Sequence, residues 1–154
     1  MVKLKTLIGQ DAEPFIHDLA HLRMTVFRDY PYLYEGGLAY EQDYLIAFTS
    51  SERSFMAVVF DDERVVGAST AMPLIQEHTE FKQPFIDKGY TLQDIFYFGE
   101  SLLLPEYRGQ GLGVKFFEAR EDHAREQGYK LATFCAVERP DNHPAKPENY
   151  QPLH

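Results

Sequence analysis

The spacing of apolar residues divides the first third of the chain into a short alternating segment and two segments of helical period. Residues 2–8 alternate well enough to predict a first strand. In residues 11–29 the apolar side chains recur at helical spacing, with Pro14 in a suitable first turn, which predicts a helix packed on a sheet. Residues 30–37 break that helix, and residues 40–50 predict a second, shorter one.

The middle of the chain predicts a hairpin and then a buried strand. Residues 54–60 and 65–73 are apolar and rich in β-branched side chains, and the polar segment between them has the composition of a hairpin turn. The polar and aromatic residues 76–90 are compatible with a helix that ends at Gly89. The apolar residues 95–104 predict the central strand of the sheet.

The pattern then changes from strand to helix across residues 108–113, which read Arg-Gly-Gln-Gly-Leu-Gly. The helical pattern that follows covers residues 114–127 and has Gly128 as its predicted C-cap. Residues 131–138 predict one more strand, parallel to the central strand through a right-handed crossover. A strand, a glycine-rich turn and a helix N-terminus therefore follow one another directly.

This glycine-rich turn has the chemistry of an anion-binding site. Glycine visits positive φ and lets a ligand approach the backbone closely. The first amide groups of a helix have no partner within the helix, and the positive end of the helix dipole adds to their attraction for phosphate. Arg108 adds a charged donor beside them. The sequence therefore predicts a ligand that carries phosphate.

The spacing of the turn separates three known phosphate-binding loops. Lys115 follows Val114 with no hydroxyl residue after it, which excludes a Walker loop, and the gaps between the glycines do not fit a dinucleotide fingerprint. The remaining pattern, Arg-x-x-Gly-x-Gly after a strand, resembles the acyl-CoA-binding loop of the GCN5-related N-acetyltransferase superfamily. Residues 99–107 also look like that family's central strand and its exit. The alternative is a glycine-rich turn that only links a strand to a helix.

The order of elements over residues 4–137 is similar to that of the family. The resemblance implies an α/β fold with a mixed central sheet flanked by helices, in which two splayed parallel strands form the acyl-CoA cleft. It implies one domain, residues 1–138, followed by a proline-rich segment, residues 139–154. Acetyl-CoA is the implied acyl donor. By the same resemblance the pantetheine arm is bound by backbone groups of Leu102, Leu103 and Leu104, and the pyrophosphate by Arg108, Gly109, Gln110, Gly111, Leu112 and Gly113.

The implied reaction is attack of an amine on a thioester, which needs a group that removes a proton from the amine. Glu100 is the candidate base, because the family often carries a catalytic glutamate on this strand and because a carboxylate in an apolar strand is costly unless it is paired or functional. The alternative is a structural glutamate, bonded to the amides of a bulge or paired with a neighbour such as Arg139.

The end of the chain departs from the family pattern. Residues 139–154 are rich in proline and lack periodicity, whereas the family continues with a helix, often carrying a tyrosine that protonates the CoA thiolate, and a hairpin. Tyr150 is the candidate substitute acid. The chain is expected to be a shortened member or to be completed by another chain. Because residues 131–137 would leave an apolar strand edge exposed, we expect a homodimer or another cover for that edge.

Composition narrows the class of protein. The 154 residues are 44% hydrophobic and 25% charged, as in ordinary globular domains. The net charge of −9 argues against a nucleic-acid partner, and it either favours a cationic amine by steering or only keeps the protein soluble. Cys135 lies in an apolar run and is expected to be buried. No apolar stretch reaches membrane-spanning length, so a cytoplasmic location is expected.

The sequence contains no further strong site. His17 and His21 are one helical turn apart, but no third ligand lies nearby, so no metal site is predicted. Our prediction is an acetyl-CoA-dependent N-acetyltransferase that acts on a primary amine of a small molecule or a peptide. The alternative is a catalytically inactive CoA-binding or interaction module.

Overall fold

The computed structural model describes residues 1–29, 32–33, 37–135 and 144–146. Its described strands form one sheet in the order β1-β2-β3-β4-β5. Neighbouring strands are antiparallel except β4 and β5, which are parallel, so the predicted mixed sheet and the parallel crossover are confirmed. The strand bounds are β1 Val2–Ile8, β2 Phe55–Asp61, β3 Arg64–Pro73, β4 Ile95–Leu103 and β5 Leu131–Phe134.

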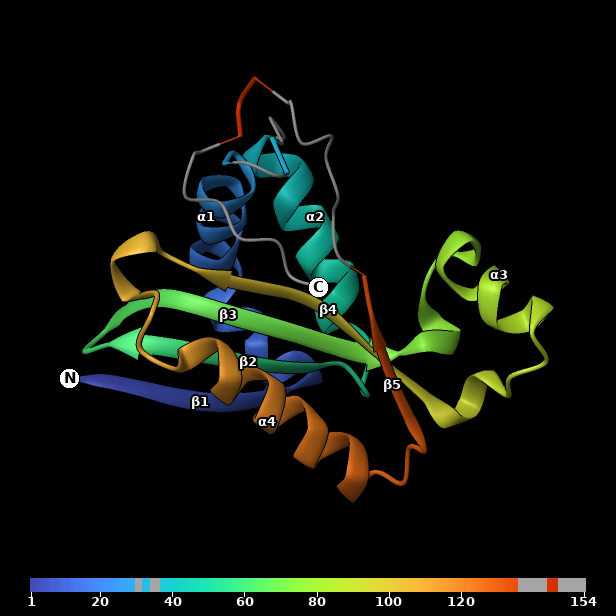
Figure 1. The fold of residues 1–154 in the computed structure, drawn as a ribbon. Coiled ribbons are helices and arrows are strands. Elements are labelled where there is room, and N and C mark those ends of the chain that lie inside the picture. Colours follow the sequence, from blue (N-terminus) through green and yellow to red (C-terminus); the bar gives the residue numbers. More distant parts are fainter. Residues whose placement is uncertain (30–31, 34–36, 136–143, 147–154) are drawn as a thin grey trace.

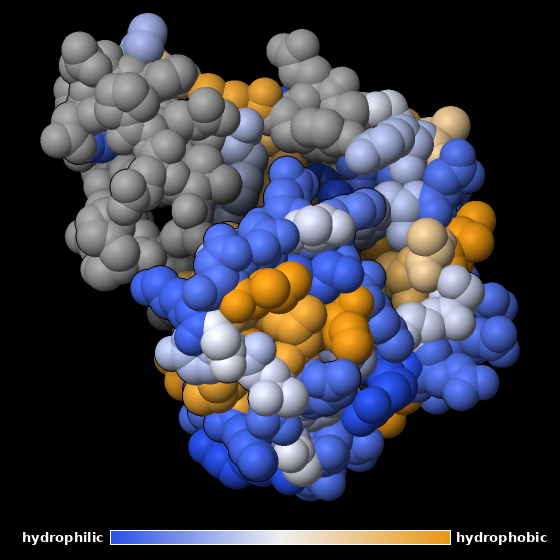
Figure 2. Space-filling view, turned by 90° about the vertical axis from the view of Figure 1, so that its right-hand side faces the viewer, coloured by the Kyte–Doolittle hydropathy of each residue, from blue (hydrophilic) through white to orange (hydrophobic). Residues whose placement is uncertain are grey.

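Helices cover both faces of this sheet (Figure 1). One face carries α1 and α2, the other carries α4, and α3 lies beyond the end of β3. The α-helix bounds are α1 Ile16–Phe27, α2 Leu38–Thr49, α3 Thr79–Asp87 and α4 Leu112–Glu126. Figure 2 looks at the end of the molecule where α3 lies, and there small hydrophobic patches are set among mostly hydrophilic side chains.

The prediction of a helix over residues 11–29 is wrong for its first turns. Gly9–Phe15 is a 3-10 helix, and the α-helix begins only at Ile16. Pro14 has no N–H and cannot donate an α-helical hydrogen bond, which favours the irregular start. The other helices agree with the predictions, including α3 in the segment for which the pattern was weakest. The predicted last strand runs past residue 134, whereas β5 ends at Phe134; residues 136–143 lie outside the described part.

The core lies between the sheet and the helices on its two faces. Five consecutive residues of β2, Phe55 to Val59, are buried, so this strand is covered on both faces and its sequence is a continuous apolar run. On the α4 side, Phe116 is buried and His123 stacks on Phe55, with ring centroids 4.4 Å apart. This packing holds α4 in place against the sheet.

A bulge interrupts the pairing of β3 with β4. The register passes from Ser69 opposite Ser101 to Ala71 opposite Phe98, so that Thr70 faces two residues, Gly99 and Glu100. A Cβ on Gly99 would lie 2.4 Å from the hydroxyl oxygen of Thr70, which explains the glycine at this point. The bulge directs the side chain of Glu100 toward α1 and α2.

Parallel pairing of β4 with β5 stops near the same place. The last paired residues are Phe98 and Phe134, and β4 continues to Leu103 without a described partner strand on that side. Among the described residues, the last part of β4 therefore has no strand partner on the side away from β3.

Candidate functional site

The glycine-rich turn ends in a bare helix N-terminus. Gly109 and Gly111 have φ values of +77° and +83°, and Gly111 is the N-cap of α4 with no side-chain cap. The first helical hydrogen bond runs from the N–H of Lys115 to the carbonyl of Gly111, at 3.2 Å, so the three preceding helix amides have no helical acceptor. Arg108 and Gln110 are exposed beside them. This arrangement suits an anion.

Gly113 is different from the other two glycines of the turn. Its φ is not positive, and nothing lies within 4 Å of the position that a Cβ would take. Neither the backbone nor the described neighbours therefore require glycine there. The open space beside the first turn of α4 fits the close approach of a phosphate group.

The exit of β4 offers backbone groups on its open side. The N–H of Leu104 donates to the carbonyl of Val66 at 3.0 Å, so the backbone groups of Leu104 point toward β3. Those of Leu102, two residues earlier, point in the same direction. Alternation then turns the backbone groups of Ser101 and Leu103 away from β3. The carbonyl of Leu103 accepts a hydrogen bond from Arg108 Nε at 3.0 Å, which ties the glycine-rich turn to the strand.

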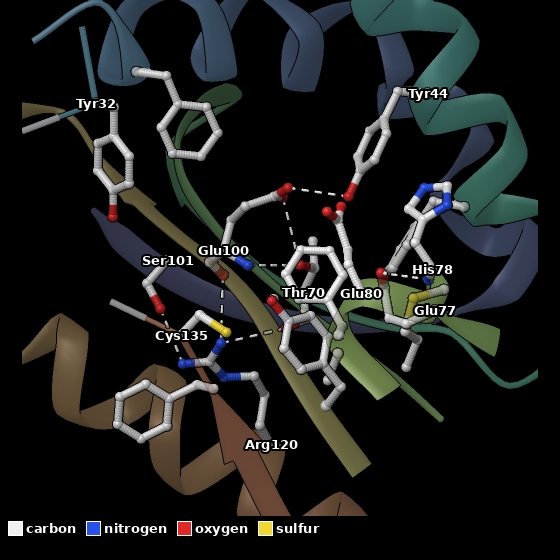
Figure 3. A pocket seen from close by; sticks show the side chains of 18 of the residues that line it. Tyr32, Tyr44, Thr70, Glu77, His78, Glu80, Glu100, Ser101, Arg120 and Cys135 are labelled. Carbon is white, nitrogen blue, oxygen red and sulfur yellow. Dashed lines mark hydrogen bonds between the residues drawn. The ribbon is translucent and has the colours of Figure 1, made fainter. Parts of the chain in front are cut away.

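A cavity of about 480 Å³ lies beside the bulge, between β4, β5, α2 and the segment that contains α3 (Figure 3). Its volume is in the range of ordinary small-molecule sites. Glu100 lines it together with Thr70, Gly99 and Ser101, and Phe134 and Cys135 line it from β5 and the residue after it. The described cavity therefore opens next to the point where β4 and β5 separate.

The carboxylate of Glu100 is held by donors from three other elements. Arg23 of α1 makes an ion pair and a hydrogen bond with Oε1. The hydroxyl of Tyr44 on α2 donates to the same oxygen at 3.2 Å, and that of Thr70 lies 3.4 Å from Oε2. The backbone N–H of Glu100 donates to the Thr70 hydroxyl oxygen at 2.9 Å. The orientation of this carboxylate is thus fixed before any ligand binds.

Arg23 connects Glu100 with a second, fully buried carboxylate. Its Nε pairs with Glu41 of α2, which is 0% exposed, and its guanidinium lies 4.3 Å from the ring centroid of Tyr44. Burial disfavours the charge of Arg23, but the two carboxylates outweigh burial and hold its pKa above the ordinary value. The pKa of Tyr44 is also raised, by burial and by Glu100. No described group bonds Oε1 of Glu41.

Arg120 of α4 supports the bulge from the other face of the sheet. Its NH1 donates to the carbonyls of Thr70 and Glu100, both at 3.3 Å, and its NH2 donates to the Ser101 hydroxyl at 2.9 Å. Burial lowers its pKa to about 10. The guanidinium contacts the rings of Phe98 and Phe117 at 4.7 and 4.6 Å from their centroids, and it satisfies carbonyls that the bulge takes out of the strand ladder.

The far wall of the cavity comes from the segment around α3. Glu77, His78, Glu80 and Phe81 line it, and Figure 3 shows Glu80 and Glu100 directed into the same space. Tyr97 of β4 also lines it, and its pKa is raised by burial and by its neighbour Cys135. None of these residues stood out in the sequence, because no local motif marks them.

The structure brings some of the predicted residues together and corrects the prediction that Cys135 is buried. The glycine-rich turn, the β4 exit and Glu100 follow one another along the same side of the fold. Cys135 is exposed and not buried, because it follows a strand at the edge of the sheet. Tyr150 and Arg139 lie outside the described residues. Arg23, Tyr44 and Glu41 are the partners that the sequence did not reveal.

Neither a metal centre nor a membrane-spanning helix is found in the described part of the chain. The rings of His17 and His21 contact each other, with centroids 4.6 Å apart, and no group of three or more His, Cys, Asp or Glu residues within the described ranges is arranged to hold a metal ion. None of the helices in those ranges combines the length and the apolar character needed to cross a bilayer.

Comparison with known proteins gives a family from one search and a shared fold from another. A family model described as the acetyltransferase (GNAT) family matches residues 16–147. A search of curated proteins found no match. Among solved structures, the chain is similar to the aminoglycoside N-acetyltransferase AAC(6')-Iy in complex with CoA, with a TM-score of 0.63 and 10% identity over 92% of this chain and 80% of that chain.

Two further solved structures share the fold. An aminoglycoside acetyltransferase, meta-AAC0020, from an uncultured soil metagenomic sample has a TM-score of 0.62 and 18% identity, over 99% of this chain and 97% of that chain. A ribosomal-protein-alanine N-acetyltransferase from Brucella melitensis biovar Abortus 2308 has a TM-score of 0.59 and 14% identity, over 92% and 85%. At these identities the likeness concerns the fold.

Proposed function

The chain belongs to the GNAT acetyltransferase family, and from that premise we propose that it transfers an acetyl group from acetyl-CoA to a primary amine. The observation that carries the proposal is the bare N-terminus of α4 at the end of β4, beside open backbone groups and a cavity that contains a fixed carboxylate. This supports an arrangement in which the α4 N-terminus binds a pyrophosphate, the end of β4 binds an extended arm, and the cavity holds an amine.

Each part of the site has a role in this proposal. The α4 amides, Arg108 and the glycine-rich turn, residues 109–113, bind the pyrophosphate. In this proposal the pantetheine arm binds backbone groups of Ser101 and Leu103 that face away from β3. The resemblance implied Leu102, Leu103 and Leu104, but the backbone groups of Leu102 and Leu104 face β3. Glu100 accepts a proton from the amine, directly or through a water molecule.

Acetyl-CoA supplies the acetyl group as a thioester: the amine nitrogen bonds to the carbonyl carbon, the carbon–sulfur bond breaks, and CoA leaves as a thiolate that takes up a proton. The phenol of Tyr97 lines the cavity next to β5 and is a described candidate donor for that proton. A tyrosine phenol carries its proton at neutral pH. Tyr150 stays the candidate that the family resemblance suggests.

One observation favours a second function, that of a CoA-binding module without transfer activity. Both oxygens of the Glu100 carboxylate already accept hydrogen bonds from Arg23, Tyr44 and Thr70. A carboxylate with this many partners fits a structural role as well as a catalytic one. Binding of acetyl-CoA and release of CoA thiol must therefore be measured separately.

The binding part is tested by calorimetric titration of acetyl-CoA into the wild type and a Gly113→Asp variant. Because the site of the new side chain is open and φ is ordinary, the variant should fold normally and place a carboxylate near the pyrophosphate. We expect at least a tenfold loss of affinity, and a much smaller loss in the neutral, equally sized Gly113→Asn variant. Equal affinity in all three proteins, or no binding by the wild type, would contradict the proposed cofactor site.

A further inference from the structure

The cavity next to Glu100 combines aromatic walls with carboxylates. Its volume of about 480 Å³ leaves room for more than the reacting amine itself. The acidic residues that line it are Glu77, Glu80 and Glu100. The aromatic residues that line it are Phe27, Tyr32, Tyr40, Tyr44, Phe48, Phe81, Tyr97, Phe117 and Phe134.

The arginines near the cavity already have partners. Arg120 is the one Lys or Arg among the described lining residues, and its guanidinium donates to the carbonyls of the bulge and to Ser101. Arg23 is bound to Glu100 and Glu41. Lys82 of α3 does not line the cavity. Within the described ranges, neither Glu77 nor Glu80 forms an ion pair with a cation, so the wall formed around α3 carries two carboxylates without counter-ions.

Glu77 shows the electrostatic effect of this arrangement. It is half-buried, and burial raises the pKa of its carboxyl. The backbone N–H and the side-chain charge of His78 lower this pKa, and the nearby charges of Glu100 and Glu80 raise it further. One compensating contact is the backbone N–H of His78, 3.3 Å from Oε2. A partly desolvated carboxylate close to two others is stabilised most directly by a cation placed among them.

The aromatic rings favour the same kind of ligand. Phe81 and Tyr97 contact each other with ring centroids 5.5 Å apart, and both line the cavity beside the carboxylates. The face of an aromatic ring attracts an ammonium group. The same rings can pack against the methylene groups that join two ammonium groups of one ligand. A neutral or anionic acceptor would make no use of the charge on this wall, and an anionic one would be repelled by it.

We propose that the acceptor is an amine with at least two cationic groups, of which one reacts beside Glu100 and a second is held by Glu77 and Glu80 against the aromatic wall. This inference rests on the proposed function, since it names the substrate class of the same site. Glu77 and Glu80 are then residues that determine specificity, and they take no part in the chemical step.

The test uses binding, so that it does not depend on turnover. Calorimetry in the presence of saturating CoA compares 1,4-diaminobutane with butylamine and 1,8-diaminooctane with octylamine. For at least one pair, the diamine should bind the wild type at least tenfold more tightly than the monoamine of equal length. In a Glu77→Gln/Glu80→Gln variant this advantage should fall at least tenfold, while monoamine affinity should change less than threefold.

The matched control is Glu13→Gln/Glu118→Gln, which removes the same net charge from exposed positions that do not line the cavity and should leave both affinities unchanged. Equal binding of diamines and monoamines by the wild type, no binding of either diamine, or equal losses in the two double variants would overturn the inference. Titration of acetyl-CoA into the same samples separates the outcomes: acetyl-CoA binding without a diamine preference rejects this inference alone, and absence of acetyl-CoA binding rejects the proposed cofactor site.

Discussion

Glu100 near the end of β4 and the glycine-rich turn that follows this strand lie close together in the chain, but their surroundings are built in opposite ways. The turn uses the backbone amides of one short segment, is exposed, and has one strong side-chain tie, from Arg108 to the Leu103 carbonyl. The Glu100 carboxylate is surrounded by side chains from α1, α2 and β3. Glu41, the other carboxylate that pairs with Arg23, is buried. One region depends on local conformation and the other on packing between distant segments.

This difference determines what a substitution does in each region. In the turn, a change alters a ligand site whose backbone is exposed to water, so binding should change more than stability. Near Glu100, a change that removes one charge leaves another buried without a partner, so stability should change as well. The predictions below test this separation, beginning with the largest expected effect.

Arg23→Met should be the most destabilising of these changes. The substitution leaves Glu41, which is fully buried, and Glu100 without their shared cation. Breaking a buried pair in this way costs about 3–5 kcal/mol, which corresponds to a fall in melting temperature of about 10 °C for a domain of this size. Thermal unfolding followed by circular dichroism measures it.

The control for this change is Arg125→Met, because Arg125 is exposed and pairs with Glu121 and Asp122 on its own helix. That variant should melt within about 2 °C of the wild type. An equally small effect of Arg23→Met would show that the buried charges near Glu100 do not contribute to stability, and the contrast between the two regions would fail.

Glu100→Gln should separate catalysis from binding. Loss of a general base typically costs a factor of about 10² or more in rate, so kcat should fall about a hundredfold while acetyl-CoA affinity changes little. The readouts are thiol release with an amine that the wild type acetylates and calorimetry with acetyl-CoA. A loss of less than about threefold in kcat would assign Glu100 to the structural role and favour the binding-module alternative.

Arg108→Gln should act in the opposite way. The guanidinium is exposed beside the α4 N-terminus, and loss of one charge-assisted contact to a phosphate is worth about tenfold in affinity. Calorimetry should show weaker binding of acetyl-CoA, with a difference from the wild type that shrinks at high salt, because exposed charges are screened. The melting temperature of the free protein should stay within about 2 °C. A large loss of stability would mean that the tie to Leu103 is structural.

The contrast also explains how much of the molecule could be predicted from the sequence. The strands, α2, α3, α4 and the turn follow from periodicity and from the glycines at positions 109, 111 and 113, because these features are local. Gly111 is an example, since its positive φ at the start of α4 is the conformation that the pattern implied. The first helix was predicted to begin too early, because a 3-10 helix that contains Pro14 has the same apolar spacing.

The partners of Glu100 could not be predicted in the same way. Arg23 and Tyr44 are far from Glu100 in the sequence, and only the packing of α1 and α2 on the sheet brings them together. Burial of Glu41 was equally hidden, since a glutamate in an amphipathic helix normally faces water. The roles assigned to the site residues, the homodimer, the cytoplasmic location and the domain boundary at residue 138 stay predictions.

The smallest expected effect concerns Glu77, a carboxylate that has no ion-pair partner among the described residues. The folded-state pKa of Glu77 is raised above its ordinary value of 4.5, so the folded protein holds a proton on this group more readily than the unfolded chain does. Stability from this group is therefore lost as the pH rises above 4.5, and below that value the two states differ little. Glu77→Gln should accordingly raise the melting temperature at pH 7 by about 1 °C, a small effect because water screens a half-exposed group, and should leave it unchanged at pH 4. Scanning calorimetry at both pH values, with the exposed Glu13→Gln as control, measures the difference. A lower melting temperature at pH 7 would mean that the Glu77 carboxylate already has a stabilising partner. The cavity wall formed around α3 would then attract a second ammonium group less strongly.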